Sequence, residues 1–249
     1  MSRRLLIALP LVVVALLVVA AGSWWFFIRE SNSLATSAPA IPTELVASTP
    51  GAGSTPDADA TSGSGAPRDD LTFAILPDRS DASYFVGEKL AALPLPSTAK
   101  GSTSAIAGAF RLTPSGDLDP SQPATFTVDL TQLRSDKDMR DARVQSQGLQ
   151  TQTFPKATFT ATKVTGWDAS APAGQEQDVQ LTGTLDLHGV QKEVTWDVKA
   201  RHDGNVITAL ATTNFKFADF GIPILNIAGF VSIQDNVTLQ IQVVAQSSQ

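Results

Sequence analysis

The sequence predicts an all-β domain of antiparallel strands that follows one transmembrane helix and a disordered linker. Three observations lead to this fold class: an uncharged apolar stretch near the N-terminus, a long stretch of small and polar residues after it, and alternating apolar and polar residues from Leu71 onward. Alternation with a period of two is typical of strands with one buried side and one solvent-facing side. The 249 residues therefore divide into an anchor at 1–30, a linker at 31–69 and a β domain at 70–249.

The anchor is expected to be a single-pass helix. Residues 5–28 carry no charge, and about 20 apolar residues in a helix suffice to cross the hydrocarbon core. The aromatic residues that close this stretch suit the membrane interface, and the Arg3-Arg4 pair places the N-terminus in the cytoplasm under the positive-inside bias. Cleavage after Ala21 or Gly22 would also fit the small residues there, but we favour an uncleaved anchor with the β domain outside the cytoplasm.

The linker is rich in Ser, Ala, Thr, Pro and Gly. Such a segment buries too little apolar surface to offset the entropy lost on ordering. We expect a flexible tether that holds the β domain off the membrane while keeping it concentrated there. A spacer with no further role is the simpler interpretation.

Composition excludes several function classes. The net charge is −6 and no Lys/Arg block follows the first four residues, so a nucleic-acid partner is not expected. Zero cysteines exclude disulfides, thiolate metal sites and cysteine nucleophiles, and two histidines are too few for a multi-histidine metal centre. We expect no metal, no catalytic cofactor and no catalytic residue.

The strands follow from the alternation. The clearest runs are Thr125–Leu130, Leu181–Leu187, Val194–Lys199 and Val237–Val243, and weaker ones are Phe73–Leu76, Tyr84–Leu90, Thr103–Leu112, Ala157–Val164 and Val206–Phe215. His188-Gly189 and Asp203-Gly204 have the composition of tight hairpin turns, so at least three consecutive strands form a meander. Between strands, Ser135 or Asp136 is expected to cap a short helix that runs through Gly148 on one rim.

About eight antiparallel strands without covering helices must bury their apolar faces and protect their edges. Closure into a barrel does both, and a two-sheet sandwich would also bury the apolar faces. An eight-stranded barrel has an interior that side chains can fill or that can hold one slender ligand. Alternation by itself leaves these alternatives open.

Four segments resemble a known family. The run Arg140–Leu149, which leads into Phe154–Phe159, is similar to the signature of the YceI-like polyisoprenoid-binding family. Three further segments agree with that family in order: Leu185–Val190 with Lys192, Asp219–Ile222 and Val237–Leu239. The resemblance implies an extended lipocalin-like antiparallel barrel, whose apolar interior holds an isoprenoid chain. The lipid is commonly a quinone or polyprenyl type, in the bacterial periplasm or outside the cell.

The candidate ligand-binding residues form an inward stripe. They are Phe110, Phe126, Val128, Phe159, Leu185, Leu187, Trp196, Val198, Leu239 and Ile241. Alternation alone favours a filled core, since any half-buried sheet displays it. The resemblance reverses that preference for some of these residues.

An unusually apolar segment follows the strand that ends at Phe215. It contains Phe217, Phe220, Ile222, Ile224, Leu225, Ile227 and Phe230. An exposed apolar loop indicates a pocket mouth, a lid or a rim that touches a membrane. A plug folded over the barrel end is an equal alternative, so Phe215, Phe217 and Phe220 are included as ligand-binding candidates.

Three polar residues are candidates for contact with a lipid head group. Arg140 and Arg143 would bind a quinone carbonyl or a phosphate if they faced the mouth, and would otherwise form a solvated helix face. His188 is most simply a hairpin residue whose ring bonds a neighbouring backbone group, and no G-x-S-x-G motif supports a nucleophile beside it.

Three functions are compared. The leading hypothesis is a non-enzymatic carrier of an isoprenoid lipid. The second is an envelope-structural or protein-interaction module with a filled β core. The third, an enzyme acting on a lipid or quinone, has little support from the residues.

Overall fold

The structure is a computed structural model that describes residues 32–46, 71–90, 97–225 and 231–247. The expected anchor at 1–30 lies outside the described residues, as do linker residues 47–69 and the apolar residues Ile227 and Phe230. In the described part of the chain, no helix is both long and apolar enough to cross a bilayer.

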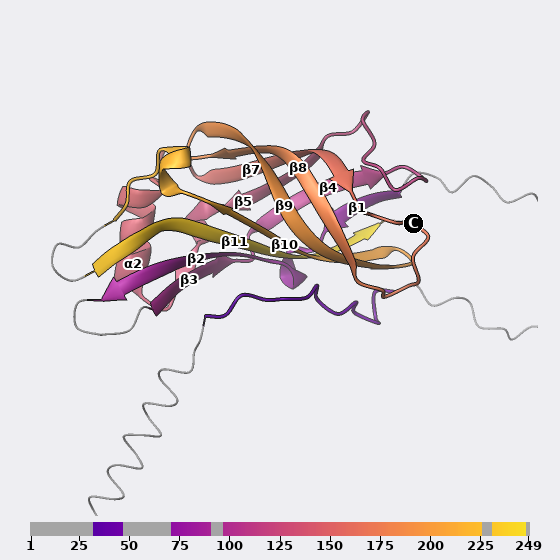
Figure 1. Ribbon diagram of the computed structural model, residues 1–249, viewed down its shortest axis with the longest axis horizontal. Helices are drawn as coiled ribbons and strands as arrows, with labels where there is room; N and C mark the ends of the chain where they lie inside the picture. The colour runs from indigo at the N-terminus through magenta and orange to yellow at the C-terminus, as the bar shows by residue number, and fades with distance from the viewer. Residues whose placement is uncertain (1–31, 47–70, 91–96, 226–230, 248–249) are drawn as a thin grey trace, which may run out of the picture. The chain divides into compact units, whose positions relative to one another are not determined.

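The described residues form strands with a few short helical turns (Figure 1). The strands are β1 (Leu71–Ile75), β2 (Asp81–Leu90), β3 (Ser97–Thr103), β4 (Ile106–Leu112), β5 (Ala124–Asp129), β6 (Arg134–Ser135), β7 (Lys156–Thr165), β8 (Gln177–Leu187), β9 (Val190–Asp203), β10 (Val206–Phe215) and β11 (Val231–Ser247). The helical elements are η1 (Pro77–Arg79), η2 (Leu130–Gln132), α2 (Asp138–Arg143), η3 (Val144–Gly148) and η4 (Phe217–Phe220).

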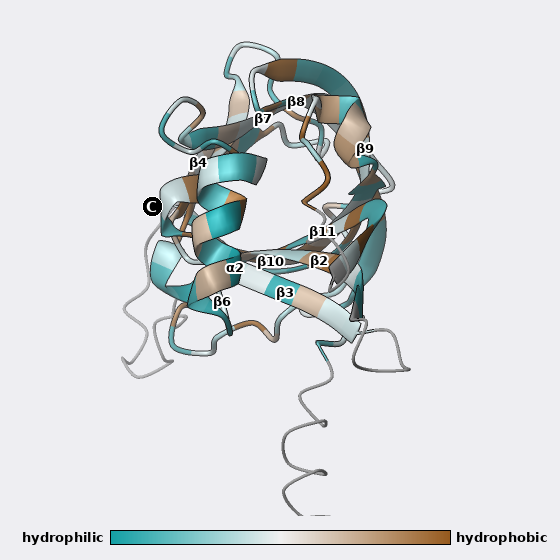
Figure 2. Ribbon diagram, turned by 90° about the vertical axis from the view of Figure 1, so that its left-hand side faces the viewer, coloured by the Kyte–Doolittle hydropathy of each residue, from teal (hydrophilic) through white to brown (hydrophobic). Residues whose placement is uncertain are grey.

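The sheet closes into a barrel. Eight strands pair in the antiparallel order β1-β4-β5-β7-β8-β9-β10-β11, and the ring closes where Phe73 in β1 pairs with Ser247 in β11. The rest of the long strand β11 also pairs with β2, which continues into β3 and β6. Figure 2 looks into the ring from the end at which α2 lies. The structure therefore confirms the expected barrel of about eight strands and excludes the sandwich.

Two hairpins join β8, β9 and β10 into the expected meander. His188 and Gly189 connect β8 to β9, and both have positive φ (56° and 74°), as a type I′ turn requires. The second turn differs from the expected Asp203-Gly204 pair. Asp203 pairs with Val206, so the turn residues are Gly204 and Asn205. The shift has a simple cause: the first turn position has φ of 55°, which suits glycine better than aspartate.

The expected helix is present, but neither Ser135 nor Asp136 caps it. The residue before its first turn is Lys137, which makes no capping bond through its side chain. Ser135 instead pairs within the sheet and donates its hydroxyl to Asp141 at 2.6 Å, while Asp136 binds Arg140. These two side chains are thus already engaged. The helix continues as a π-helical turn that ends at Gly148, the end that the sequence predicts.

Part of the expected disordered linker is ordered. Residues 34–46, which we call the docked segment, lie along the outside of the barrel (Figure 1). Ala38 in this segment is only 6% exposed, and the hydroxyl of Thr208 in β10 donates to the carbonyl of Pro39 at 2.8 Å. The composition argument failed here because side chains on the outer face of the barrel satisfy the backbone of the segment.

We call the end of the barrel that carries α2 and the β8–β9 turn the mouth. The opposite end, at which β1 pairs with β11, is the far end. Inside, an apolar row of aromatic rings leads from the far end toward the middle. Successive ring centroids along Phe73, Phe110, Phe126, Phe159 and Trp196 lie 5.3, 6.0, 6.3 and 5.8 Å apart. This row fills part of the interior and leaves the mouth half more open.

Candidate functional site

The barrel interior contains two adjoining cavities. The outer cavity, at the mouth, has a volume of about 300 Å³, and the inner cavity has a volume of about 190 Å³. Both are lined by the same five residues where they meet: Val128, Ala157, Leu185, Leu239 and Ile241. The interior is therefore an elongated apolar space rather than a core filled from rim to rim.

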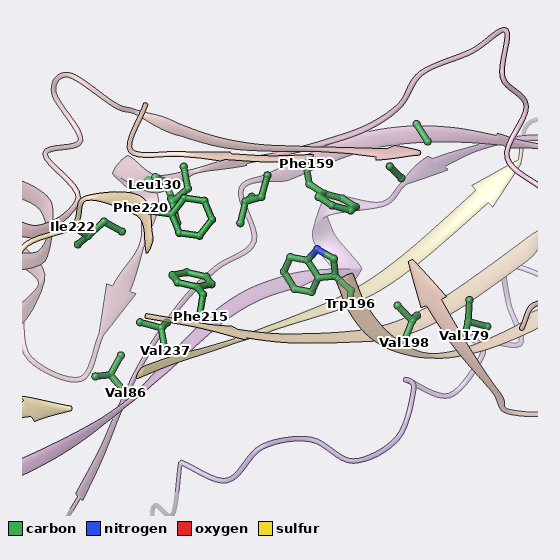
Figure 3. Close-up of a cluster of buried hydrophobic side chains, with 14 of the residues drawn as sticks. Val86, Leu130, Phe159, Val179, Trp196, Val198, Phe215, Phe220, Ile222 and Val237 are labelled. Atoms are coloured by element: carbon green, nitrogen blue, oxygen red, sulfur yellow. The ribbon is translucent and has the colours of Figure 1, made fainter. Parts of the chain in front are cut away.

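Most residues of the predicted stripe line these cavities. The outer cavity takes in Leu187, Phe215 and Phe217, and the inner cavity takes in Phe110, Phe126, Phe159, Trp196 and Val198, in addition to the shared Val128, Leu185, Leu239 and Ile241. Figure 3 shows Phe159 and Trp196 facing each other across the interior. Alternation placed these residues on the correct face of each strand, and ligand contact by each of them stays a prediction.

Phe220 does not line either cavity. Its side chain is fully buried, with 0% exposure, and its ring lies 4.8 Å from that of Phe215, also seen in Figure 3. It acts as a plug beneath the loop. By contrast, Ile222 and Leu225 in the same loop line the outer cavity. The two interpretations of this apolar segment therefore apply to different residues.

His188 also lies outside both cavities. Its ring packs against Phe154 at a centroid distance of 4.6 Å, and its Nδ1 lies 3.2 Å from the carbonyl oxygen of Phe220. His188 is therefore a hairpin residue whose ring contacts a backbone carbonyl, as the sequence analysis expected. Its candidate role at a lipid head group does not fit this position, because the ring fastens the β8–β9 turn to the loop after β10.

Arg140 lines the outer cavity but is already paired. Its Nε and one terminal nitrogen each lie 3.2 Å from the carboxylate of Glu88, and its other terminal nitrogen binds Asp136 and Ser135. Burial lowers the pKa of Arg140, but the hydrogen bonds that its guanidinium donates to Asp136 and Glu88 outweigh this effect and raise the pKa. Two carboxylates offset one guanidinium, so Arg140 has little charge left to attract an anionic head group.

Arg143 is placed differently. It lines the same cavity one helical turn after Arg140. Among the described residues, it has no hydrogen-bond or ion-pair partner. Of the two arginines that line the outer cavity, Arg143 is therefore the one whose guanidinium remains available to a ligand.

Tyr84 is a polar residue of the site that the sequence analysis did not single out. It lines the outer cavity from β2, and its hydroxyl is buried with no hydrogen-bond partner among the described residues. Burial raises the pKa of Tyr84 to about 12, although the nearby charge of Arg140 acts in the opposite direction. A buried, unpartnered hydroxyl in an apolar cavity is suited to bond an acceptor on a ligand.

The neighbouring strand makes room for the Tyr84 ring. A Cβ on Gly101, which pairs with Tyr84, would lie 2.3 Å from the ring. Tyr84 is the only tyrosine of the chain and alternates with Val86 and Glu88, two further residues that line the outer cavity. A lone tyrosine on the inward side of a strand was the available signal.

The described residues contain no group of three or more His, Asp or Glu side chains that could hold a metal ion. Glu88 and Tyr84 are ionisable residues that line the outer cavity beside the two arginines. Glu88 is held by Arg140, and the raised pKa of Tyr84 keeps its hydroxyl protonated near neutral pH.

A scan against protein families matches residues 73–245 to the YceI-like domain. This chain belongs to the YceI-like domain family. The four segments on which the resemblance rested meet at the mouth of the YceI-like barrel, where Phe154 contacts His188 and Lys192 pairs with Asp219 at 3.3 Å. The expected family is confirmed.

Solved structures support the YceI-like fold. A polyisoprenoid binding domain from Saccharophagus degradans, implicated in plant cell wall breakdown, aligns with a TM-score of 0.55 at 18% identity, over 72% of this chain and 99% of that one. BcnA from Burkholderia cenocepacia aligns with a TM-score of 0.51 at 20% identity, over 69% of this chain and 99% of that one. A search of curated proteins found no match.

Proposed function

We propose that this protein binds an isoprenoid lipid in its barrel and acts as a non-catalytic carrier outside the cytoplasm. The observation that carries the proposal is the pair of adjoining apolar cavities, about 300 and 190 Å³ in volume. The membership of the YceI-like family and the similarity to a polyisoprenoid binding domain support the same ligand class. A filled β module would not need such an interior.

The size of the interior fits the tail of an isoprenoid. At roughly 30 Å³ per water-sized group, the two cavities hold about 16 carbon-sized groups, or about three isoprene units. Burial is worth about 0.8 kcal/mol per methylene, so such a tail gains on the order of 10 kcal/mol before ordering costs. A longer chain would extend through the mouth.

The polar groups at the mouth favour an uncharged head group. Arg140 is offset by Glu88 and Asp136, and Glu88 itself is only 8% exposed. The Tyr84 hydroxyl and the Arg143 guanidinium are hydrogen-bond donors that suit a carbonyl oxygen. A diphosphate would meet one unpaired cation and a buried carboxylate, so we favour a quinone over a polyprenyl diphosphate.

We further propose that the protein is bacterial and anchored in a membrane by residues 5–28, with its N-terminus in the cytoplasm and the barrel in the periplasm or outside the cell. The uncharged apolar stretch and the Arg3-Arg4 pair support this placement.

The test is to identify lipid that copurifies with the full chain. Native mass spectrometry and organic extraction of the detergent-purified protein are expected to yield an isoprenoid, and titration of emptied protein with a quinone is expected to reload it. Repeated recovery of empty protein that binds neither a quinone nor a polyprenol would refute the proposal.

A further inference from the structure

The docked segment follows β11 in one direction. The backbone N–H and carbonyl of Ala35 both bond the side-chain amide of Gln240, each at 2.9 Å. Ten residues later, the carbonyl of Leu45 accepts a hydrogen bond of 3.1 Å from the side chain of Gln246. As the chain proceeds from Ala35 to Leu45, its partners therefore move along β11 toward the far end.

The contact buries side chains that point away from the barrel interior. Val206 and Thr208 alternate with the cavity-lining Ile207 and Ala209, so they face outward, yet both are 0% exposed. Leu210 follows the same pattern at 3% exposure. Outward residues on a barrel are buried only when something covers them, and the docked segment lies on this face.

Charged residues hold the docked segment at both of its ends. Near its start, Glu176 accepts hydrogen bonds from the Ser37 hydroxyl and from the Ala38 N–H, the latter at 3.0 Å. The Ser37 hydrogen bond is the main cause of the lowered pKa of Glu176. Near its end, Glu44 pairs with Arg79 at 2.7 Å. The docked segment is thus held on the barrel by contacts at several points along its length.

The direction of the docked segment relates its start to the mouth. Ile233 and Val237 in β11 line the outer cavity, whereas Ala245 pairs with β1 at the far end. Gln240 lies between Leu239 and Ile241, which line both cavities, so the docked segment begins near the middle of the barrel and runs from there to the far end. Its start is therefore nearer to the mouth than its end.

The distance between the docked segment and the proposed anchor is short. The apolar stretch ends at Ile28 and the docked segment begins at Leu34, and six residues span at most about 20 Å. A flexible linker over the whole of 31–69 would instead allow a root-mean-square separation of about 35 Å. Docking therefore turns a long tether into a short one.

The mouth also presents apolar side chains to its surroundings. In the described part of the chain, the exposed large hydrophobic residues are Met139 at 72%, Leu34 at 44% and Ile224 at 38%. Met139 lines the outer cavity and Ile224 lies between two residues that line it, so both lie at the mouth, whereas Leu34 begins the docked segment near the middle of the barrel. Exposed apolar side chains around a ligand entrance are typical of a surface that contacts a membrane.

We propose that the docked segment holds the barrel against the bilayer with its mouth rim, marked by Met139 and Ile224, in contact with the lipid surface. This inference rests on the proposed anchoring and deepens the proposed function, because the lipid would then enter the barrel directly from the membrane. The partner of the rim is the bilayer itself, not a second protein.

The absence of cysteine in the sequence makes a direct test practical. Single substitutions Met139→Cys and Ile224→Cys in the full chain, labelled with an environment-sensitive fluorophore, report on the rim. Gln122→Cys, at an exposed position in the β4–β5 connection at the far end, is the matched control. In proteoliposomes of phosphatidylcholine and phosphatidylglycerol with nitroxide-labelled lipid, we expect quenching at the rim to exceed that at Gln122 several-fold.

A second variant separates docking from the anchor. Gln240→Ala combined with Ala38→Glu removes the clamp on Ala35 and places a charge at a buried contact. Quenching at the rim should fall to the level of the far end, and hydrogen exchange in the docked segment should rise. Gln242→Ala is the control, because Gln242 lies on the same outer face of β11 and its side chain has no hydrogen-bond partner among the described residues. It should change neither the quenching at the rim nor the hydrogen exchange of the docked segment.

The outcomes are distinguishable. Equal quenching at the rim and the far end, rim quenching that survives undocking, or a mature chain that lacks residues 1–28 would each overturn the inference. Loss of isoprenoid binding in detergent while rim quenching persists would count against the proposed function alone.

Discussion

At the scale of single residues, Tyr84 is the group whose removal tests the head-group site most directly. Tyr84→Phe keeps the ring over Gly101 and removes only the unpartnered hydroxyl. A net hydrogen bond is worth about 1 kcal/mol, so we expect quinone affinity to fall about fivefold. Titration with a quinone, measured by quenching of tryptophan fluorescence, would check this value.

The control for Tyr84→Phe is a ligand without a carbonyl. A polyprene hydrocarbon should bind the variant and the parent protein equally, because it makes no use of the hydroxyl. Stability should not fall, since an unsatisfied buried polar group is lost. Equal loss of affinity for the quinone and the hydrocarbon would show that Tyr84 acts only by packing.

Protonation of Asp136 is expected to contribute to the loss of stability at acid pH. Burial raises the pKa of Asp136, but the hydrogen bond and charge of Arg140 outweigh it and lower the pKa below its usual 3.8. Because the pKa of Asp136 is lower in the folded state, its full contribution to the free energy of unfolding is present at any pH above its pKa in the unfolded state. This contribution is lost as the pH falls through its pKa in the folded state.

We therefore expect Asp136→Asn to be less stable than the parent protein at neutral pH, with a difference that shrinks as the pH falls below 3.8, the ordinary pKa of an aspartate. Urea unfolding at a series of pH values measures this. Asp138→Asn is the matched control, as Asp138 has no ion-pair partner among the described residues. A difference that stays constant with pH would contradict the assignment.

Single residues also show which parts of the site could be predicted from sequence patterns. Alternation placed stripe residues such as Phe159 and Trp196 correctly, because apolar side chains on one strand face share one environment. Tyr84 and Glu88 were missed because polar residues at inward positions look like breaks in that pattern. For Phe220 the sequence left two positions open, facing the cavity or plugging the loop, because composition is the same in both cases; the structure has the plug.

At the scale of elements, β7 carries the junction between the two cavities. Ala157 lines both of them, and its small side chain leaves the passage open. Ala157→Phe should close the passage and restrict the ligand to the outer cavity. We expect affinity for a long-chain quinone to fall markedly while that for a short-chain quinone changes little, at a stability cost of about 1–3 kcal/mol.

The comparison of chain lengths is the measurement, and Thr158→Phe is the control. Thr158 is adjacent in β7, so its side chain points to the opposite face of the strand. Equal loss for both chain lengths in Ala157→Phe would mean that the inner cavity does not receive the tail.

Elements differed in how well the sequence predicted them. β10 has the predicted bounds Val206–Phe215, since it is rich in apolar and β-branched residues and is bounded by the turn at Gly204. β3 was missed for the most part because its buried positions, Ala99, Gly101 and Thr103, are too small to give a hydrophobic signal. Gly101 is small because the Tyr84 ring occupies that space, which is a cross-strand constraint invisible in either strand alone.

At the scale of the whole molecule, closure of the barrel depends on contacts between the two ends of the β domain. Phe73 and Ile75 in β1 pair with Ser247 and Ala245 in β11. Local alternation cannot choose the partner of an edge strand, so it left both a barrel and a sandwich open, and only the resemblance to the YceI-like family favoured the barrel. The order of the docked segment likewise depends on contacts between residues far apart in the sequence, because side chains on β10 and β11 hold it in place.

The whole barrel should be stabilised by its ligand. An isoprenoid that binds only the folded chain at a free concentration of 100 times its Kd adds about 2.7 kcal/mol to the free energy of unfolding. For a domain of this size, 1 kcal/mol shifts Tm by roughly 2–4 °C, so loading should raise Tm by about 5–10 °C. Differential scanning calorimetry of lipid-extracted and reloaded protein measures the shift.

In Ala157→Phe, the Tm shift produced by a long-chain quinone should shrink toward the shift produced by a short-chain quinone, because only the outer cavity stays available. A full Tm shift in that variant would mean that the stabilisation arises at the barrel surface rather than in its interior.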